Sequence, residues 1–393
     1  MTVRVCLIRQ SAYPDELNIR REVETLLREG FDAHVISMDA KERPAGYHRE
    51  ETINGVHVHR LPLRRKKAST ARYLYDYLAF AAVAAIKVTQ LHLRHRFDVV
   101  QVNTMPDFLV FSALVPKLLG AKVVVMMQEP VPELWFTLRG KPAPAILAAA
   151  EQAALKFADA ALTVTQQLKD TYVRRGARAD KISVILNVPD TSFLEVGAES
   201  AELGAHRDGF TLICHGAIED RYGQDTILDA VAIARARVPG LRVRILGRGS
   251  YLDQFLAKRE SLKLEDCVHY LGYVPLPTMV GEILAADAGI VAQKSSPYSN
   301  LVHTNKMYEY IHLGKPVLAS RLSATEAYFG QDALRYFEAG DPHSLAEAIV
   351  DLYEHPEKRD VLRDNAWRLY EDYKWDKQKE QYLAVYRRLL TRN

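Results

Sequence analysis

The sequence is poor in cysteine and nearly neutral in charge. Its 393 residues include three cysteines, Cys6, Cys214 and Cys267, which cannot form a disulfide framework, and no pair of them has metal-ligand spacing. Lysine and arginine total 52 against 49 acidic residues, a formal net charge of +3. A chain that binds nucleic acid over a wide surface is usually more basic. These absences favour a reducing compartment and argue against a nucleic-acid-binding protein.

Long hydrophobic runs are also absent. The longest, Leu78 to Ile86, falls far short of the roughly 20 residues that span a bilayer. Met1 to Gln10 has no charged segment followed by an apolar one, as a secretory signal would have. We therefore expect a soluble, cytoplasmic protein. At roughly 150 residues per domain, its length predicts two or three domains.

Short apolar runs alternate with amphipathic helical stretches along the whole chain. Residues 3–8 form the first predicted strand and 18–29 the first predicted helix, while Asn54-Gly55 is a hairpin signal. The periodicity stops in a polar segment at 187–209, which predicts a domain linker, and then restarts. This alternation predicts two doubly wound α/β domains, which bind ligands at the carboxyl ends of their strands.

One segment combines a helix start with chemically useful side chains. From His303 to Val317 a polar loop leads into a short helix and then a buried strand. The helix N-terminus suits a phosphate group, and Lys306 in its first turn adds a full charge. Glu309 lies on the same helix face, where its carboxylate suits the vicinal hydroxyls of a ribose. The alternative is a capped amphipathic helix with a surface lysine and glutamate.

The same segment resembles the donor-site signature of family 4 of the GT-B glycosyltransferases, which reads Lys-x-x-Glu-Tyr-x-x-x-Gly-Lys-Pro-Val. Further stretches resemble other parts of that family in the same order and spacing, and they cover nearly the whole chain: 215–223, 245–249, 271–274, 287–291, 101–107, 128–134, 172–176 and 185–187. The resemblance implies a GT-B fold of α/β class, in which two doubly wound Rossmann-like domains face each other across a cleft.

The resemblance also implies different functions for different parts of the chain. We expect an N-terminal acceptor-binding domain over residues 1–190 and a nucleotide-sugar-binding domain over 208–371. The C-terminal helix within 372–393 is expected to return to the N-terminal domain. As in GT-B proteins generally, domain closure would complete the site and exclude water.

The implied activity is transfer of a hexosyl or N-acetylhexosaminyl group from a nucleoside diphosphate sugar, with UDP as the expected nucleotide, and with retention at the anomeric carbon. The acceptor would be a polysaccharide, a lipid-linked glycan or a small molecule, in a bacterial biosynthetic pathway. Such a transferase must stabilise a departing diphosphate. The chain has no Asp-x-Asp to hold a metal ion, but it offers Arg221, Lys306 and a helix N-terminus. The resemblance thus implies a metal-independent enzyme without a cofactor.

The resemblance assigns roles to individual positions. The expected catalytic residues are Gln128, Glu129, Arg221 and Lys306. The expected donor-binding residues are Gly216, Arg221, Gly247, Gly272, Tyr273, Val274, Asn300, His303, Thr304, Asn305, Lys306 and Glu309. The acceptor is expected around Tyr13 to Asp15, Asn103 to Asp107 and Gln128-Glu129.

Two departures from the family pattern concern the donor site. A glutamate that commonly contacts the sugar hydroxyls is replaced by Leu301, so that Asn300 or Ser299 would have to make similar contacts. The usual arginine and lysine of the first loop fall at Ala217 and about Tyr222. Arg221 is then the one basic residue of this loop that can take the roles of the usual arginine and lysine.

A third departure is in the N-terminal half. Where the family often has a histidine near the anomeric centre, this chain has Gln128, whose amide can position a substrate but cannot carry a proton. Glu129 is then either the nearest carboxylate or a loop-capping or arginine-paired residue. Two other functions stay open: a sugar-nucleotide 2-epimerase of the same fold, and a catalytically silent nucleotide-sugar-binding partner subunit.

The sequence also contains less specific signals. The basic run from Arg60 to Lys67, with tyrosines following, predicts either a peripheral contact with an anionic membrane or a solvated loop. His57 and His59 have no third ligand near them in the sequence, so we expect surface residues. His92 and His95 can share a helix face, but we expect no metal site there.

Overall fold

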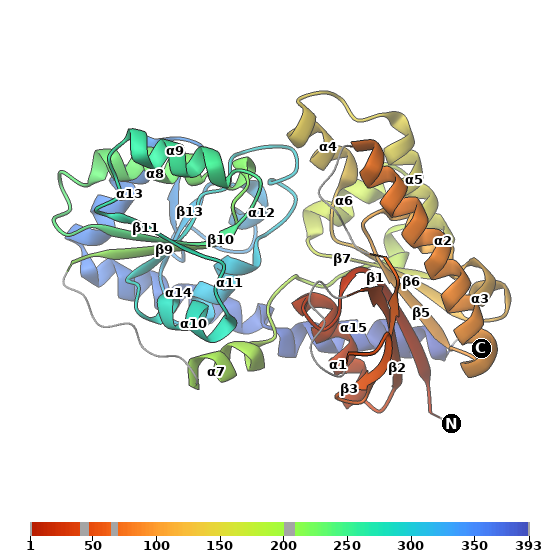
Figure 1. Ribbon diagram of the computed structural model, residues 1–393. Helices are drawn as coiled ribbons and strands as arrows, with labels where there is room; N and C mark the ends of the chain where they lie inside the picture. Colours follow the sequence, from red (N-terminus) through yellow and green to blue (C-terminus); the bar gives the residue numbers. More distant parts are fainter. Residues whose placement is uncertain (1, 40–46, 64–69, 200–208, 392–393) are drawn as a thin grey trace. The chain divides into compact units, whose positions relative to one another are not determined.

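The computed structural model describes residues 2–39, 47–63, 70–199 and 209–391, and it divides into two compact units (Figure 1). Unit 1 comprises Met1–Leu186 together with Asp376–Asn393, and unit 2 comprises Asn187–Trp375. Each unit contains its own sheet with helices packed on it, so the predicted α/β class with two parallel-sheet domains is confirmed.

The described residues of unit 1 form an eight-stranded sheet in the order β3-β4-β2-β1-β5-β6-β7-β8. Its strands are β1 Arg4–Ala12, β2 Asp32–Met38, β3 Glu50–Ile53, β4 Val56–Leu61, β5 Val99–Asn103, β6 Lys122–Met127, β7 Ala160–Thr163 and β8 Ile182–Val184. All neighbouring pairs are parallel except β3 and β4, which form the predicted hairpin. At its turn, Asn54 and Gly55 have φ angles of 48° and 87°, the combination that a tight hairpin favours.

The helices of unit 1 cover this sheet (Figure 1). They are α1 Leu17–Arg28, α2 Thr70–His95, η1 Asp107–Ala113, α3 Leu114–Leu118, α4 Val131–Arg139, α5 Ala145–Phe157, α6 Gln166–Arg174, η2 Ala179–Lys181 and, from the other end of the chain, α15 Trp375–Leu390. Tyr382 and Tyr386 of α15 both donate hydrogen bonds to Oε1 of Gln101 on β5, at 3.0 and 2.6 Å. The last helix is therefore fastened to the centre of the unit 1 sheet.

Helix α2 has one buried apolar face and one exposed apolar face. Phe80, Ala84, Val88 and Leu91, at helical spacing, are fully or almost fully buried, which is the pattern of a helix that covers a sheet. By length and composition, Arg72–His95 is also apolar enough to cross a membrane, with 22% of its most apolar window buried. The chain therefore carries an exposed apolar helix face that its short uninterrupted runs do not reveal.

Unit 2 has a six-stranded sheet among the described residues, in the order β11-β10-β9-β12-β13-β14 and parallel throughout. Its strands are β9 Thr211–Ala217, β10 Arg242–Arg248, β11 Val268–Gly272, β12 Ala288–Val291, β13 Val317–Ser320 and β14 Arg335–Phe337. The helices are α7 Thr191–Glu199, η3 Asp220–Tyr222, α8 Gln224–Ala234, α9 Leu252–Ser261, α10 Leu276–Leu284, α11 Asn305–His312, α12 Ser323–Glu326, α13 Pro342–Glu354 and α14 Pro356–Tyr373.

The segment expected to be a linker contains a helix. Asp190 accepts hydrogen bonds from the backbone N–H and hydroxyl of Ser192, at 3.1 and 2.7 Å, and so caps the start of α7. Gly197 allows α7 to lie close against Val280 of α10, because an added Cβ would come within 2.9 Å of that side chain. Residues 200–208, the rest of the predicted linker, lie outside the described residues.

A histidine cluster at the edge of unit 1 also corrects an expectation. His59 is buried, not on the surface, and its Nε2 lies 3.0 Å from Nδ1 of His34. His57 does have carboxylate and imidazole neighbours, since Asp32 and His34 on β2 lie beside it. The parallel pairing of β2 with β4 brings these residues together, and no sequence spacing indicates it.

Candidate functional site

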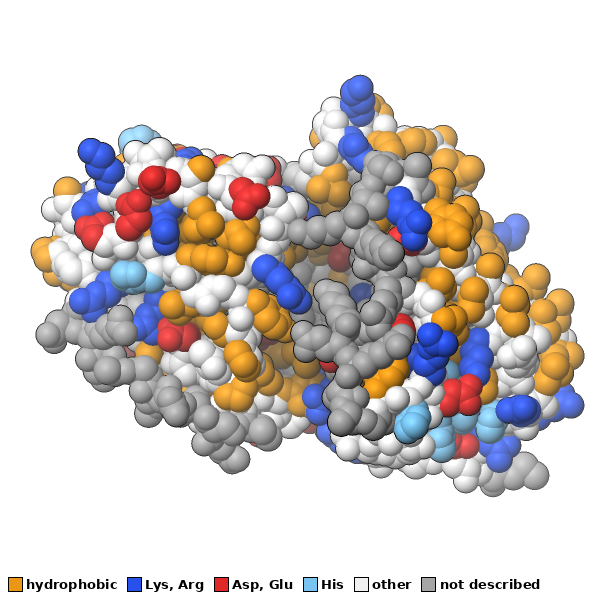
Figure 2. Space-filling view, in the orientation of Figure 1, with side chains coloured by type: hydrophobic (Ala, Val, Ile, Leu, Met, Phe, Trp, Pro, Cys, Tyr) orange, Lys and Arg blue, Asp and Glu red, His pale blue; other side chains and the backbone are white. Residues whose placement is uncertain are grey.

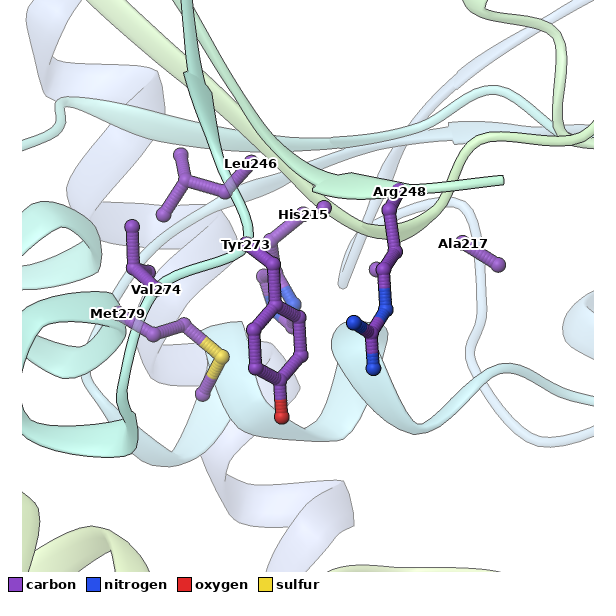
Figure 3. Close-up of a pocket in the computed structure, with 9 residues that line it drawn as sticks. His215, Ala217, Leu246, Arg248, Tyr273, Val274 and Met279 are labelled. Carbon is purple, nitrogen blue, oxygen red and sulfur yellow. The ribbon is translucent and has the colours of Figure 1, made fainter. Parts of the chain in front are cut away.

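A pocket of about 300 Å³ opens in unit 2 at the carboxyl ends of its central strands (Figure 3). Strand ends of β9 and β10, the loop after β11 and the first half of α10 supply its walls. The lining residues are His215, Gly216, Ala217, Leu246, Gly247, Arg248, Tyr273, Val274 and Met279. This is the edge where an open parallel sheet binds its ligand.

Two glycines let the strand ends approach each other at the pocket. Gly216 and Gly247 are registered partners on β9 and β10, with φ angles of 109° and 134°. A Cβ on Gly247 would overlap the carbonyl oxygen of Gly216. These positions therefore require glycine, and the close approach leaves backbone groups uncovered at the pocket floor.

An aromatic and a cationic side chain form one side of the pocket. Tyr273 and Arg248 run side by side in Figure 3, with the Arg248 guanidinium 4.3 Å from the centre of the Tyr273 ring. The Tyr273 side chain is 70% exposed, so its ring is available to a ligand. A flat ring at a pocket rim suits the face of a nucleobase.

Two cations converge near this pocket without an acidic partner. The Lys306 Nζ would lie 3.6 Å from a Cβ on Gly216, and it approaches the Tyr222 ring at 5.0 Å. The Arg221 guanidinium lies 4.7 Å from the same ring. Lys306 is only 8% exposed, and within the described ranges no carboxylate forms an ion pair with either cation. A buried ammonium without a counter-ion favours binding of an anion.

Helix α11 places a carboxylate on the same face as Lys306. Glu309 is 8% exposed, and its Oε2 lies 3.0 Å from Nε2 of His215 without the alignment of a hydrogen bond. In the described part of the chain these two buried atoms have no other hydrogen-bond partner. The backbone N–H of His215 donates to the Tyr310 hydroxyl at 3.1 Å, which fixes the strand end against α11. The site thus offers acceptor oxygens beside a cation.

His303 and Asn300, both expected to contact the donor, have hydrogen-bond partners within the protein. Nδ1 of His303 lies 2.7 Å from the Tyr308 hydroxyl and Nε2 lies 2.7 Å from the Ala324 carbonyl. Burial lowers the pKa of His303 to about 4, so the ring is neutral at physiological pH. The Asn300 amide accepts from Ser323 and donates to Ser295 and Ser296. Both side chains instead hold the loop before α11 in place.

Gly272, Thr304 and Asn305, also predicted for the donor site, are not among the residues that line this pocket. Gly272, with φ 75°, makes the turn that leads to Tyr273 and Val274. Thr304 precedes α11, and its buried hydroxyl makes no hydrogen bond among the described residues. Asn305 begins the helix, whose first N–H groups lack intrahelical partners. Ser299, the other candidate for the sugar contact, is buried and hydrogen-bonded within its own turn.

In unit 1 several of the expected acceptor residues are buried. Asn103 is fully buried, and its amide donates to Glu22. Asp107 is 4% exposed, and burial, followed by repulsion from Glu151, raises its pKa to about 8. Tyr13 is buried as well, while Asp15 is exposed. Gln128, directly after β6, is 6% exposed, and its Nε2 has no hydrogen-bond partner within the described ranges.

Five pocket residues were missing from the predicted set. His215 and Ala217 flank the predicted Gly216, and Leu246 and Arg248 flank the predicted Gly247. These four stand at strand ends, so the rule that ligands bind there indicates them. Met279 lies on α10, and only the three-dimensional structure brings it to the pocket.

Two protein-family models together match most of the sequence. The glycosyl transferase 4-like domain model matches residues 17–187, and the model for glycosyl transferases group 1 matches residues 209–355. The sequence matches no curated protein.

Solved structures resemble the chain over nearly its whole length. Sucrose-phosphate synthase from Thermosynechococcus elongatus has a TM-score of 0.80 at 16% identity, covering 100% of both chains. HepE of Anabaena in complex with UDP has a TM-score of 0.72 at 16% identity, covering 98% of this chain and 99% of its own. The catalytic domain of Arabidopsis thaliana starch synthase IV, bound to ADP and acarbose, has a TM-score of 0.71 at 14% identity, with full coverage of both.

Two Rossmann-like units of this topology, resembling these structures, define the GT-B fold. The two family matches together span most of the chain. The protein therefore belongs to the group 1 glycosyltransferases with a 4-like N-terminal domain, and the predicted family is confirmed.

Proposed function

We propose that this protein transfers a sugar from a nucleoside diphosphate sugar, with UDP as its nucleotide, and retains the anomeric configuration without a metal ion. The observation that carries the proposal is the pair formed by Lys306 and Arg221, two cations without carboxylate partners in the described chain beside an open glycine-floored pocket. A diphosphate supplies the missing negative charge. HepE, of the same fold, is solved with UDP and with UDP-glucose.

The donor would be held by three kinds of contact. The base lies against Tyr273 beside Val274, and the ribose hydroxyls donate to the free oxygen of Glu309. The diphosphate binds to the ammonium of Lys306, the guanidinium of Arg221 and the first N–H groups of α11. As the glycosidic bond breaks, negative charge grows on the leaving diphosphate, and these fixed charges stabilise it more than they stabilise the ground state.

The absence of an Asp-x-Asp anywhere in the sequence supports the metal-independent form of this chemistry. In unit 1, Gln128 and Glu129 keep the roles that the family resemblance suggests. The Gln128 amide orients a substrate by hydrogen bonding, since it cannot transfer a proton. A screen of donor sugars would distinguish transfer of a hexosyl group from transfer of an N-acetylhexosaminyl group.

For the acceptor we propose a lipid-linked glycan at the cytoplasmic face of a membrane. Exposed apolar side chains gather on α2, η1 and α3 (Figure 2). They are Leu74, Tyr75, Leu78, Ile86, Leu93, Phe111, Leu114, Val115, Leu118 and Leu119. A contiguous apolar face of this kind is typical of a surface that rests on lipid. The basic run that ends at Lys67, of which residues 64–67 lie outside the described residues, precedes α2 and adds attraction to anionic headgroups.

A donor screen tests the activity. We expect one nucleotide class among UDP-, GDP- and dTDP-sugars to raise the melting temperature, and the matching sugar to be hydrolysed slowly, in the presence of EDTA as in its absence. Transfer to extracted envelope lipids should be faster than hydrolysis. Binding without any turnover would support the silent subunit, and interconversion of the sugar at C2 would support the epimerase.

Liposome flotation tests the membrane contact. The full chain should float with vesicles that contain anionic phospholipid, and Leu78→Glu combined with Ile86→Glu should abolish flotation. Leu271→Glu, at an exposed apolar site on unit 2, is the control and should float like the wild type. Equal flotation of all three proteins, or none, would contradict the proposed membrane contact while leaving the donor screen unaffected.

A further inference from the structure

A cluster of imidazole and carboxylate groups lies on one face of β2 and β4 at the edge of unit 1. Side chains two apart on a strand share a face, which aligns Asp32 with His34 on β2 and His57 with His59 on β4. His34 and His57 are direct partners in the parallel register, and their ring centres lie 4.6 Å apart. Ligand atoms of Asp32, His34 and His57 all lie within 4.8 Å of one another.

The spacing fits a small divalent ion. Oδ1 of Asp32 lies 3.5 Å from Nε2 of His34 and 3.6 Å from Nε2 of His57. A tetrahedral zinc ion with bonds near 2.05 Å places neighbouring ligand atoms about 3.3 Å apart. The two distances from Asp32 are within a few tenths of an ångström of this value, and the two histidine nitrogens lie within 4.8 Å of each other, so modest side-chain movements bring all three atoms to one ion. We propose that Asp32, His34 and His57 bind a zinc-class divalent transition metal ion.

His34 provides an independent sign of a missing ligand. It is 2% exposed, and its Nε2 is buried without a hydrogen-bond partner among the described residues. A buried polar atom of this kind normally has a partner. The atom points to the Asp32 carboxylate at a distance too long for a hydrogen bond and suited to a shared metal ion.

The surrounding groups orient the ligands. Nδ1 of His34 lies 3.0 Å from Nε2 of His59, and the two rings are stacked with an interplanar angle of 2°. When Nδ1 of His34 donates to His59, the lone pair of His34 is on Nε2, facing Asp32 and His57. A second hydrogen bond of this type is common behind metal-binding histidines. Arg4 lies 3.4 Å from the other oxygen of Asp32, which leaves Oδ1 for the ion.

The position of the cluster separates it from glycosyl transfer. Asp32 begins β2 and His57 is the second residue of β4, so the cluster lies at the amino-end edge of the parallel strands, whereas Gln128 follows the carboxyl end of β6 in the same sheet. The ion would join β2 to β4 and to the hairpin at the sheet edge. Its fourth ligand would be water, because the His57 side chain is 46% exposed. We infer a structural ion that stabilises unit 1 and takes no part in the reaction.

Titration of the tag-free, EDTA-treated full chain with zinc tests the proposal. Calorimetry should show one equivalent per chain, and zinc should raise the melting temperature by several degrees. His57→Gln and Asp32→Asn should each weaken binding at least tenfold and remove the melting shift. His355→Gln is the matched control, because His355 lies in unit 2 and pairs with Asp351 on α13, and it should bind zinc like the wild type.

A second measurement needs no variant. Zinc should protect His57, but not His355, from diethyl pyrocarbonate in the wild-type chain, as mapped by mass spectrometry. Cobalt bound at the same site should give the intense visible bands of a tetrahedral complex. The proposal is overturned if the wild type takes up no zinc, if both variants bind as it does, or if His57 is modified equally with and without zinc.

Discussion

Gly247 lies so close to Gly216 that its missing Cβ would overlap the Gly216 carbonyl oxygen, and the two residues are registered partners on adjacent strands. Gly247→Ala must push β9 and β10 apart at the pocket floor. We expect the free energy of unfolding to fall by about 2 kcal/mol and nucleotide binding to be lost, as measured by denaturation and thermal shift. Gly340→Ala, at φ 83° with open space around the added Cβ, should lose only about 1 kcal/mol. Equal effects of both changes would show that backbone strain alone matters.

Lys306→Met should separate binding from stability. The ammonium is buried without a carboxylate partner in the described chain, so an apolar side chain of similar length leaves the ligand-free protein as stable or more stable. The nucleotide-dependent thermal shift should disappear. Lys258→Met, which breaks an ion pair with Asp229 on α8, should leave the shift intact. Retained nucleotide binding by the Lys306 variant would exclude Lys306 from the diphosphate site.

Glu309→Gln should weaken binding of the nucleoside part of the donor and leave binding of the diphosphate unchanged. If the carboxylate holds the ribose hydroxyls, its loss removes a charged hydrogen bond, and affinity for UDP should fall about tenfold to a hundredfold. Affinity for inorganic diphosphate should stay the same, whereas Lys306→Met lowers both. Glu260→Gln, on the exposed side of α9, is the control. An equal loss of affinity for UDP and for inorganic diphosphate would show that Glu309 acts at the phosphates instead.

Asp107 should make the stability of unit 1 depend on pH. Burial raises its pKa from the ordinary 3.8 to about 8, so the folded state holds this proton over a range where the unfolded state has released it. The stability contributed by this group therefore decreases as pH rises from about 4 to about 8. Asp107→Asn should flatten that slope and raise stability at pH 8 by at least about 1 kcal/mol. Asp253→Asn, exposed on α9, should not change it.

Tyr386→Phe tests how α15 is fastened. Its hydroxyl donates to Gln101 at 2.6 Å in a fully buried network that also contains Tyr382. Removing one donor should lower the free energy of unfolding by about 1 kcal/mol, and removing both tyrosine hydroxyls by about 2 to 3 kcal/mol. Chemical denaturation measures both effects. Tyr75→Phe on the exposed face of α2 should change nothing, and stability equal to the wild type in the double variant would exclude this network as the anchor.

The sequence predicts most of the fold because periodicity is a local property. Helical periodicity predicts a long helix over about 71–94, and the structure has one over Thr70–His95; the Asn-Gly hairpin has the expected turn. Periodicity likewise predicts helices over 342–370, and the structure has two, Pro342–Glu354 and Pro356–Tyr373, the second starting at a proline. The short helices α4 and α7 were not predicted, since Pro130 and Pro132 at the start of α4 and Gly197 within α7 are typical of turns.

The site could be predicted only where backbone and motif define it. Gly216, Gly247, Tyr273 and Val274 do line one pocket, because strand ends and glycines mark it in the chain. One partner of His303 and one of Asn300, Ala324 and Ser323, belong to α12, about 20 residues later, and nothing in the segment around 300–303 indicates these two contacts. The pairing of His34 with His57 likewise depends on strand order rather than on spacing.

The fastening of α15 to Gln101 has a consequence for synthesis on the ribosome. Unit 2 is a continuous stretch of chain, whereas unit 1 combines the first 186 residues with the last helix. Until residue 390 has left the exit tunnel, Gln101 on β5 and the neighbouring Glu22 on α1 lack the two tyrosine hydroxyls that complete their network. The part translated first is thus completed last, and a nascent chain truncated before α15 would carry one finished unit and one unfinished unit.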